Sequence, residues 1–328
     1  MKIYFVTCSL KEGGEAVFID KLSFYLKRRK WNVRTIPIRN KKYSSKIDLE
    51  NTLSQHFVYG LKSLLTLFKF YIRNNNVIST FHNNLSSNSA YKRAIYKMRN
   101  WVILNLVTMF SKKIILLTRQ QQLKMEEKIL FKGIFNRKSV VINNFIEKES
   151  IIKDKENLND KILFVGRYTP IKGFEDLIKL ASELKDVDFS LIGDNNFRSN
   201  LPNLKNHGKV NNLKILKYYD KSSILILPSY NEVFPMTILE AMARGLVILV
   251  SDIPGMREII KEGRNGYLFP PGDVEKMKEL ILYLKNNPQE IERISKNNLK
   301  DIWKFTAEKQ VKRYIKVYEE VLNEKMKK

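Results

Sequence analysis

The chain has 328 residues, of which 44% are hydrophobic and 28% charged, and its formal net charge at pH 7 is +25. This length and apolar content are sufficient for two domains, each with a core of its own. The single Cys, Cys8, excludes an intramolecular disulfide and fits a reducing cytosol. No apolar run reaches the length of a membrane span, which excludes an integral membrane protein from our expectations.

Positive charge is concentrated in the first half of the chain. Residues 1–150 carry 28 Lys and Arg against 9 Asp and Glu. From Asn51 to Met125 there is no acidic residue, whereas eleven Lys and Arg occur there. Such a one-sided field attracts an anionic surface, either nucleic acid or acidic lipid.

The chain begins with a strand and a glycine turn. Residues 2–8 are predicted to form a buried strand, and Gly13 and Gly14 then let the backbone turn before a helix over residues 15–29. In a Rossmann-like domain this turn faces the ligand, and its N–H groups approach a phosphate or a sugar hydroxyl. A pair of glycines is also typical of an ordinary strand-to-helix turn. Residues 32–38 are predicted to form the next strand.

Residues 57–73 have the pattern of a mostly apolar helix with one narrow basic stripe. Two interpretations remain open, a core helix with a solvated edge or a helix that enters a lipid interface with its cations near acidic headgroups. Residues 90–99 add four more cations. The polar positions of the stripe are Lys62, Thr66, Lys69 and Arg73.

His82 follows the carboxyl end of a strand predicted over residues 77–80. An isolated His is usually structural, so its position after the strand is the argument for a functional role. Residues 113–117 and 140–142 are predicted to be the last strands of the first half. The polar, charge-mixed stretch 143–160 is predicted to be the linker between domains.

The second half opens with a buried-strand pattern, KILFVG, that ends at Gly166. Arg167 follows directly, and Lys172 and Gly173 precede a predicted helix. Two cations that flank a glycine-bounded turn and a helix start suit a diphosphate, whose charge they would hold and whose departure they would assist. The other interpretation is a basic surface loop.

Two carboxylates, Glu232 and Glu240, stand eight residues apart after another predicted strand, residues 223–228. Pro235 favours a helix start between them and Gly245 a helix end. Ligands of open α/β sheets bind outside the carboxyl ends of strands, where Glu232 is expected. An ionised carboxylate accepts both hydroxyls of a vicinal diol, so the pair suits a ligand with a diol at each end.

Four segments, taken together and in this order, resemble the retaining, GT-B-fold glycosyltransferases of family four (glycosyl transferases group 1). Leu246 stands where the family often has Pro. The segments are residues 9–26, with the Gly-Gly loop; 81–84, with His82; 162–178, with the Gly-Arg turn and Lys-Gly helix start; and 231–269, with the E-x7-E signature.

The resemblance implies an α/β fold of two Rossmann-like domains that face a central cleft. Residues 1–150 would form the acceptor-binding, membrane-facing domain and residues 160–306 the domain that binds the nucleotide sugar. Residues 307–328 would form a helix that returns to the first domain.

The implied activity is that of a retaining hexosyltransferase. A hexose would pass from a nucleotide-diphosphate sugar to a saccharide acceptor, in the synthesis of a cell-surface polysaccharide or lipopolysaccharide. The donor is taken to be a UDP-sugar because UDP-sugars are frequent donors in the family. Attack on the same face, assisted by a diphosphate oxygen, needs neither an enzyme nucleophile nor a metal ion. We therefore expect no cofactor and no metal ligands.

The resemblance also implies roles for five side chains. Arg167 and Lys172 would stabilise the leaving diphosphate, Glu232 would hold hexose hydroxyls, Glu240 would hold the ribose, and His82 would contact the sugar. Further donor-binding positions are Gly13, Gly14, Gly166, Lys209, Val210, Phe234, Pro235 and Met236.

The basic, acid-free first half leads to a hypothesis about the acceptor, a lipid-linked saccharide at an anionic membrane. The protein would then be cytoplasmic and peripherally associated with the inner face of the cell membrane. A basic nucleic-acid-binding protein also explains the charge, but it leaves both Glu and the Gly-Arg and Lys-Gly pairs unexplained. A sugar-nucleotide epimerase of the same fold is a second alternative.

Overall fold

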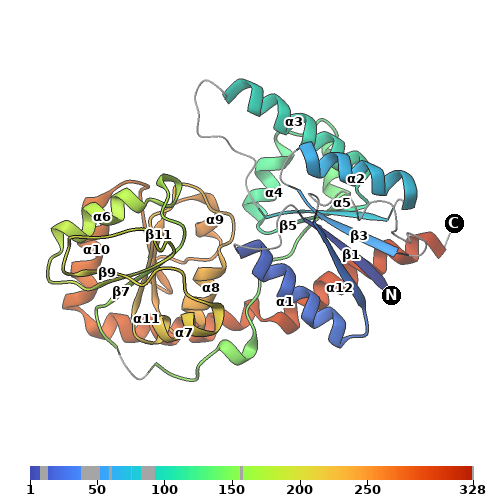
Figure 1. The fold of residues 1–328 in the computed structure, drawn as a ribbon. Coiled ribbons are helices and arrows are strands. Elements are labelled where there is room, and N and C mark those ends of the chain that lie inside the picture. Colours follow the sequence, from blue (N-terminus) through green and yellow to red (C-terminus); the bar gives the residue numbers. More distant parts are fainter. Residues whose placement is uncertain are drawn as a thin grey trace. The chain divides into compact units, whose positions relative to one another are not determined.

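The computed structural model describes residues 1–7, 14–37, 52–58, 61–74, 76–82, 93–155 and 158–326. The chain forms two α/β units (Figure 1). The first consists of Met1–Asn144 together with Ala307–Lys328, and the second of Phe145–Thr306. The predicted limits of the domains are residues 150, 160 and 306. Gly13 lies outside the described residues.

A parallel sheet forms the centre of the first unit. Its strands are β1 (Lys2–Thr7), β2 (Asn32–Pro37), β3 (Thr52–Phe57), β4 (Val77–Phe81), β5 (Lys113–Leu116) and β6 (Ser139–Val141). They are hydrogen-bonded in the order β2-β1-β3-β4-β5-β6. The order reverses between β1 and β3, as in doubly wound folds.

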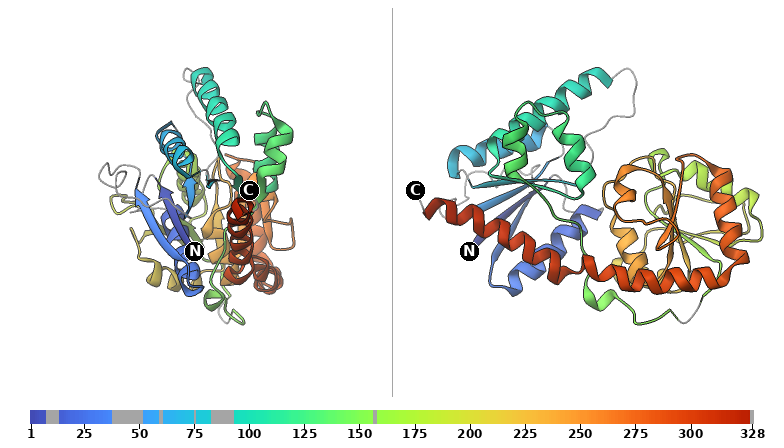
Figure 2. Two further views of the ribbon diagram at one scale, coloured as in Figure 1. Left: turned by 90° about the vertical axis from the view of Figure 1, so that its right-hand side faces the viewer. Right: turned by 180° about the vertical axis from the view of Figure 1, so that it is seen from behind.

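Helices cover both faces of this sheet, which is why its central strands are buried. The helices α2, α3 and α5 lie on one face, and α1 and α12 lie on the other (Figure 2). Among the described residues, no helix has both the length and the apolar character that a membrane crossing requires. The helices are α1 (Gly14–Arg28), α2 (Leu61–Asn74), α3 (Arg93–Phe110), α4 (Arg119–Glu126), α5 (Lys132–Lys138) and α12 (Ala307–Met326).

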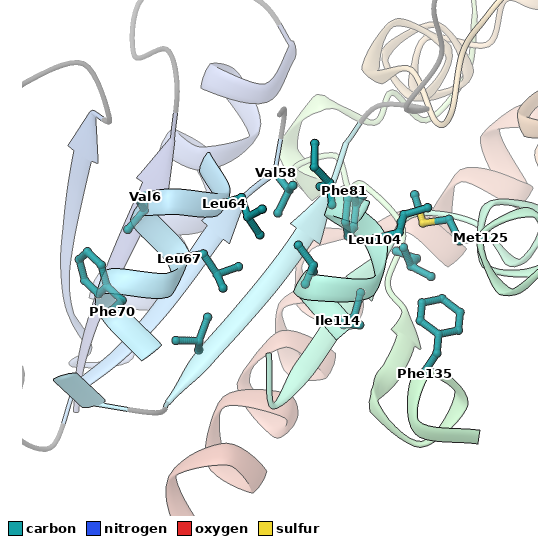
Figure 3. Packing of buried hydrophobic residues seen from close by; sticks show 14 of the residues in the cluster. Val6, Val58, Leu64, Leu67, Phe70, Phe81, Leu104, Ile114, Met125 and Phe135 are labelled. Carbon is teal, nitrogen blue, oxygen red and sulfur yellow. The ribbon is translucent and has the colours of Figure 1, made fainter. Parts of the chain in front are cut away.

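One part of the core of the first unit lies between the sheet and helices α2 and α3. Leu67 of α2 and Leu104 of α3 are buried in one cluster with Val6, Phe81 and Ile114 from the strands (Figure 3). Burial of a side chain of this size contributes about 1.5 to 3 kcal/mol. The regular apolar spacing on α2 and α3 therefore fixes the sides that they turn to the sheet.

The C-terminal helix α12 is part of the first unit. Tyr314 and Tyr318 on this helix are fully buried. The ring of Tyr314 lies 5.9 Å from that of Phe18 on α1, and the ring of Tyr318 lies 5.6 Å from that of Trp31. The helix thus returns to the first unit, as the fold expectation required.

Strand β3 was not predicted, and its last residue, Phe57, falls in the helix that was predicted over residues 57–73, which begins only at Leu61. The segment TLSQHF instead pairs with both β1 and β4. Four of its six residues, Thr52, Ser54, Gln55 and His56, are polar and buried, so the apolar run that indicates a buried strand is missing. Gln55 is satisfied by donating to Thr80 Oγ1 at 2.8 Å and by accepting from the hydroxyl of Tyr318.

The second unit also has a parallel sheet, with the order β12-β11-β10-β7-β8-β9. The order reverses between β7 and β10, which are neighbours. The strands are β7 (Ile162–Val165), β8 (Phe189–Ile192), β9 (Leu204–Asn206), β10 (Ile224–Leu227), β11 (Val247–Ser251) and β12 (Gly266–Phe269).

Most helices of the second unit follow a strand and pack against its sheet. The 3₁₀ helices are η2 (Lys148–Ser150), η3 (Pro170–Lys172) and η4 (Ile302–Phe305). The α-helices are α6 (Phe174–Glu183), α7 (Asn212–Asp220), α8 (Met236–Ala243), α9 (Pro254–Arg257), α10 (Val274–Asn286) and α11 (Pro288–Asp301).

Candidate functional site

The predicted residues of the second unit gather where its strand order reverses. The loop after β7 carries Arg167 and Lys172, and the loop after the neighbouring β10 carries Glu232. Both loops leave the carboxyl ends of parallel strands, which is where open α/β sheets bind their ligands. The topology therefore brings the two cations and the first carboxylate to one edge of the sheet.

Lys172 and Glu232 form a direct ion pair between these two loops. The side chains are only 21% and 14% exposed, so water screens this contact less than it screens a surface pair. The hydroxyl of Ser229 also donates to Glu232 at 3.3 Å. Both donors thus contact Oε1 of Glu232, and the contact with Ser229 was not predicted from the sequence.

Gly173 allows the two loops to approach each other. Its φ is +65°, and a Cβ added there would lie 2.0 Å from the carbonyl oxygen of Pro228 at the end of β10. The amide of Tyr230 donates to the carbonyl of Ile171 at 2.9 Å, which joins the same loops. Backbone packing therefore sets the separation across which Lys172 and Glu232 meet.

A third segment supports the loop that carries Glu232. Gly255, in the short helix α9, lies so close that an added Cβ would be 2.4 Å from the carbonyl oxygen of Val233 and 2.7 Å from that of Glu232. Phe234 is buried, and its ring lies 5.4 Å from that of Phe305. The loop that carries Glu232 is therefore supported by main-chain packing against Gly255 and by aromatic packing against Phe305.

Glu240 lies within α8 and contacts a different partner from Glu232. The hydroxyl of Tyr219, a fully buried residue of α7, donates to Glu240 Oε2 at 2.8 Å. Burial and the Glu240 carboxylate raise the pKa of Tyr219 well above its usual value, so it remains a donor. Neither the composition nor the periodicity of α7 singles out Tyr219, and the sequence analysis missed it.

The ends of α8 match the sequence pattern with one shift. Pro235 is the cap that precedes the helix rather than its first residue, and Met236 begins it. Helix starts leave amide N–H groups without acceptors inside the helix. At the other end Gly245, with φ +69°, donates to Met242 while Leu246 donates to Ala241, which closes the helix in a Schellman motif.

Arg167 is exposed, and its guanidinium makes no hydrogen bond or ion pair with the residues that the structure describes. It follows Gly166 directly at the carboxyl end of β7. The cation is therefore available for a ligand, whereas Lys172 is already paired.

The loops after β7, β8 and β9 are stacked through their backbones. The amide of Gly193 donates to the carbonyl of Gly208 at 3.0 Å, and a Cβ at Gly193 would lie 1.8 Å from the carbonyl oxygen of Gly166. Lys209 and Val210 follow Gly208, and the Lys209 amide donates to Asn195 Oδ1 at 2.5 Å. Their predicted contact with a nucleobase stays a prediction.

His82 and Gly14 belong to the first unit. Gly14 begins α1, and His82 follows β4 with its ring 4.7 Å from that of Phe18 and 5.3 Å from that of Phe57. Burial lowers the pKa of His82 to about 3, and its Nε2 is buried without a hydrogen-bond partner among the described residues. A neutral imidazole with an unused nitrogen can donate to, or accept from, a sugar hydroxyl.

The edge between β7 and β10 carries two cations, the carboxylate of Glu232 and the start of α8. This set suits a molecule with a diphosphate and several hydroxyls. Among the described residues, no group of three or more His, Cys, Asp or Glu is placed to hold a metal ion. The individual roles assigned to these residues stay predictions.

The second unit matches a known protein family. Residues 145–301 match the family described as "Glycosyl transferases group 1". The chain is 32% identical over 222 residues to an uncharacterized glycosyltransferase of Methanocaldococcus jannaschii, which covers 64% of this chain and 60% of that protein. It is 29% identical over 185 residues to the N,N'-diacetylbacillosaminyl-diphospho-undecaprenol alpha-1,3-N-acetylgalactosaminyltransferase of Campylobacter jejuni, which covers 54% of this chain and 49% of that one.

Solved structures resemble the whole chain at low identity. The sucrose-phosphate synthase of Thermosynechococcus elongatus superposes with a TM-score of 0.82 at 17% identity, over 98% of this chain and 99% of that one. HepE of Anabaena, in complex with UDP-glucose, superposes with a TM-score of 0.75 at 17% identity, over all of both chains. At this identity the likeness establishes the fold, which is that of GT-B glycosyltransferases.

Proposed function

We propose, since residues 145–301 belong to the group 1 glycosyltransferases, that the chain transfers a hexose from a nucleotide-diphosphate sugar to a saccharide acceptor. The matched curated relatives are longer, and the chain spans 60% and 49% of the two described above. The complex of HepE with UDP-glucose supports a UDP-sugar as the donor. The proposed reaction retains the configuration of the anomeric carbon.

One observation carries the proposal, the ion pair between Lys172 and Glu232 at the switch point of the second sheet. A cation and a carboxylate in contact, on neighbouring loops, would place the diphosphate beside the hexose hydroxyls. Arg167 adds a second cation from the same loop as Lys172. Glu240 would accept the hydroxyls of the ribose, with its carboxylate oriented by Tyr219.

The proposed step is a displacement at the anomeric carbon. The bond between that carbon and the diphosphate oxygen breaks, and its electron pair stays on the diphosphate. The acceptor oxygen forms the new bond on the same face, and its proton passes to the leaving diphosphate oxygen. Arg167 and Lys172 stabilise the negative charge that develops, so the step needs no metal ion. His82 would form a hydrogen bond with the transferred sugar.

The proposed acceptor is a lipid-linked saccharide, and the proposed location is the cytoplasmic face of an anionic membrane. The Campylobacter jejuni relative is named for a diphospho-undecaprenol acceptor, which supports this assignment. The acid-free stretch from Asn51 to Met125 supports it further, because acidic headgroups attract such a surface. The pathway would be the synthesis of a cell-surface polysaccharide or lipopolysaccharide.

Substitution of the two donor-side groups tests the proposal. A thermal-shift screen across UDP-, GDP- and ADP-sugars first identifies the donor, because a ligand that binds the folded state raises the melting temperature. We then expect Arg167→Ala and Glu240→Ala each to lower transfer of radiolabelled hexose to membrane lipid by about 100-fold or more, the usual effect of losing one stabilising group.

Two variants outside the site serve as controls. Lys179→Ala on α6 and Glu319→Gln on α12 remove exposed charges and should leave transfer within about twofold of wild type. Near-normal transfer by Arg167→Ala and Glu240→Ala, in folded protein, would contradict the site. A product that is an altered nucleotide sugar, formed without any acceptor, would indicate an epimerase instead.

A further inference from the structure

A second cluster of cations lies in the first unit, at the opposite edge of the sheet from His82. A cavity of about 380 Å³ opens there beside the amino ends of the strands. Lys112 and Lys113 line it from the start of β5, and Arg137 and Lys138 line it from the end of α5. Glu324 of α12 is the one carboxylate among its described lining residues. The cavity thus has an excess of three positive charges.

Helix ends account for part of this charge. Lys138 Nζ donates to the carbonyls of Thr108 at 2.8 Å and Met109 at 3.1 Å, in the last turn of α3. Lysine at a helix C-terminus is favourable because it satisfies free carbonyls and the helix dipole. Lys138 therefore has a structural role, but that role does not explain the other three cations.

Two carboxylates of α12 pair with Lys112 and Lys113. Lys113 pairs with Glu320 at 2.9 Å, whereas the contact between Lys112 and Glu324 is long, at 3.8 Å. The two Glu side chains are 42% and 59% exposed, so they can swing into solvent when another anion arrives. The two lysines are 21% and 23% exposed, so the pairs are partly buried on the lysine side, and a ligand anion can replace the carboxylates from the solvent side.

Arg137 is a further cation of this cavity that is available to a ligand. Its side chain is exposed and forms no hydrogen bond or ion pair with the residues that the structure describes. Burial lowers the pKa of Lys138, repulsion from the neighbouring Arg137 lowers it further, and the Glu324 carboxylate raises it. An anion between them would remove that repulsion.

We infer that this cavity binds a phosphate group through Arg137, Lys112 and Lys113. A guanidinium fork and two ammonium groups match the several acceptor oxygens of a phosphate monoester or diester. The volume fits a headgroup-sized molecule and is at the lower end of small-molecule sites. Tyr71 and Met109 give the cavity an apolar side, which suits the glycerol part of a phosphate ester.

The site is independent of the proposed sugar transfer. It lies in the first unit and shares no residue with the set that was assigned to the donor, so either proposal can fail while the other stands. The phosphate can belong to a soluble ester or to a lipid headgroup, and two arms of one experiment distinguish these sources.

The first arm measures soluble ligands by titration calorimetry of the full chain, at low ionic strength so that charges are not screened. The probes are inorganic phosphate and sn-glycerol 3-phosphate. The second arm measures co-sedimentation with phosphatidylcholine vesicles, with and without phosphatidic acid. Binding in the first arm assigns a soluble ester, and binding confined to the second assigns a lipid headgroup.

The decisive comparison is between two double variants with the same change in charge. Lys112→Glu with Arg137→Glu alters the cavity, whereas Lys128→Glu with Lys132→Glu alters exposed residues of the same unit outside it. We expect the cavity variant to bind the phosphate probe at least about tenfold more weakly and the control to stay within about threefold of wild type. Equal loss in both, or no phosphate-dependent binding by wild type in either arm, would overturn the inference.

A single variant with the opposite effect guards against misfolding. Glu324→Gln removes the carboxylate that competes for Lys112, so it should tighten phosphate binding by about twofold or more. A folded Glu324→Gln protein with unchanged or weaker phosphate binding would count against the site.

Discussion

At the scale of single residues, Gly173 sets the geometry of the proposed donor site. A residue with a Cβ pays for a φ of +65° with about 1 to 2 kcal/mol. The atom that the Cβ would meet, 2.0 Å away, is the main-chain oxygen of Pro228, which cannot rotate aside. Any side chain at this position therefore pushes apart the two loops that carry Lys172 and Glu232.

We predict that Gly173→Ala weakens both stability and donor binding. Strain and crowding together should lower the free energy of unfolding of the second unit by about 2 to 5 kcal/mol. The affinity for the donor sugar should fall at least about tenfold, because the cation and carboxylate no longer meet. Thermal melting and calorimetric titration of the donor measure the two effects.

Gly133→Ala is the matched control, since an added Cβ there meets nothing within 4 Å. Gly133 lies inside α5, where Ala is more favourable than Gly by about 1 kcal/mol. The control should melt at the wild-type temperature or above it. A Gly173→Ala protein that behaves like this control would show that the close approach to Pro228 is unimportant.

At the scale of elements, strands with a clear apolar sequence pattern were predicted from that pattern. The runs that became β1, β7 and β10 are mostly apolar, and each of these strands was predicted. Strand β3 was missed because most of its residues are polar, and the buried Gln55 finds its partners on β4 and on α12. Periodicity cannot show such partners, because they come from distant parts of the chain.

The same distinction applies to the candidate site, where some features were predictable from the sequence and others were not. The spacing of Arg167, Lys172 and Glu232 after strands was sufficient to predict that they share one edge of a sheet. The contacts of Ser229 and Tyr219 were not predictable, since a hydroxyl in a loop or helix has no pattern that names its acceptor. The sequence was therefore sufficient to locate the loops that carry the site residues, whereas the hydrogen-bond partners of those residues depend on the tertiary packing.

The outer side of α2 bears on the two interpretations of its basic stripe. Lys69 and Arg73 are exposed there, as both interpretations require. Leu65 and Ile72 are also exposed, at 59% and 67%, and Phe68 at 42%. A core helix with a solvated edge has no reason to expose three large apolar side chains, whereas a helix that enters a lipid interface does.

We predict that the exposed apolar residues of α2 contribute to membrane binding. Replacement of Leu65 and Ile72 by Ser should weaken binding to anionic vesicles about tenfold, because two side chains no longer enter the interface. Vesicle flotation at two salt concentrations measures this loss. Replacement of the exposed Leu282 and Tyr283 of α10 by Ser is the control. Equal binding by both double variants would favour the core-helix interpretation.

At the scale of the whole molecule, the two units differ in their buried titratable groups. In the first unit, burial lowers the pKa values of His56 and His82 to about 3. Burial also raises the pKa of Glu15 to about 7, against a weaker lowering by its hydrogen bond from Thr7. In the second unit, the pKa of the more exposed His207 is lowered, mainly by burial and to a smaller extent by the positive charges of Lys205 and Lys221.

These shifts act in opposite directions on stability in acid. The neutral forms of His56 and His82 stabilise the fold above pH 6.5, and this stability is lost as the pH falls below 6.5, by about 2 kcal/mol each at pH 5. Glu15 opposes folding most above pH 7, and its cost disappears as the pH falls towards 4.5, which returns about 2 kcal/mol at pH 5. The sum leaves the first unit about 2 kcal/mol less stable at pH 5 than at pH 7.5.

We therefore predict that mild acid loosens the first unit and that His56→Gln removes most of this loss. Hydrogen exchange, expressed as protection factors for peptides from β1 and β3, measures the free energy of opening at pH 7.5 and pH 5. The wild type should lose about 2 kcal/mol between these pH values, and His56→Gln close to none, because one buried imidazole no longer has to stay neutral. His207→Gln, in the other unit, should leave the loss in β1 and β3 unchanged. If His56→Gln retains the full loss, protonation of His56 is not what destabilises the unit, and the burial of a neutral imidazole in β3 is not the source of its acid sensitivity.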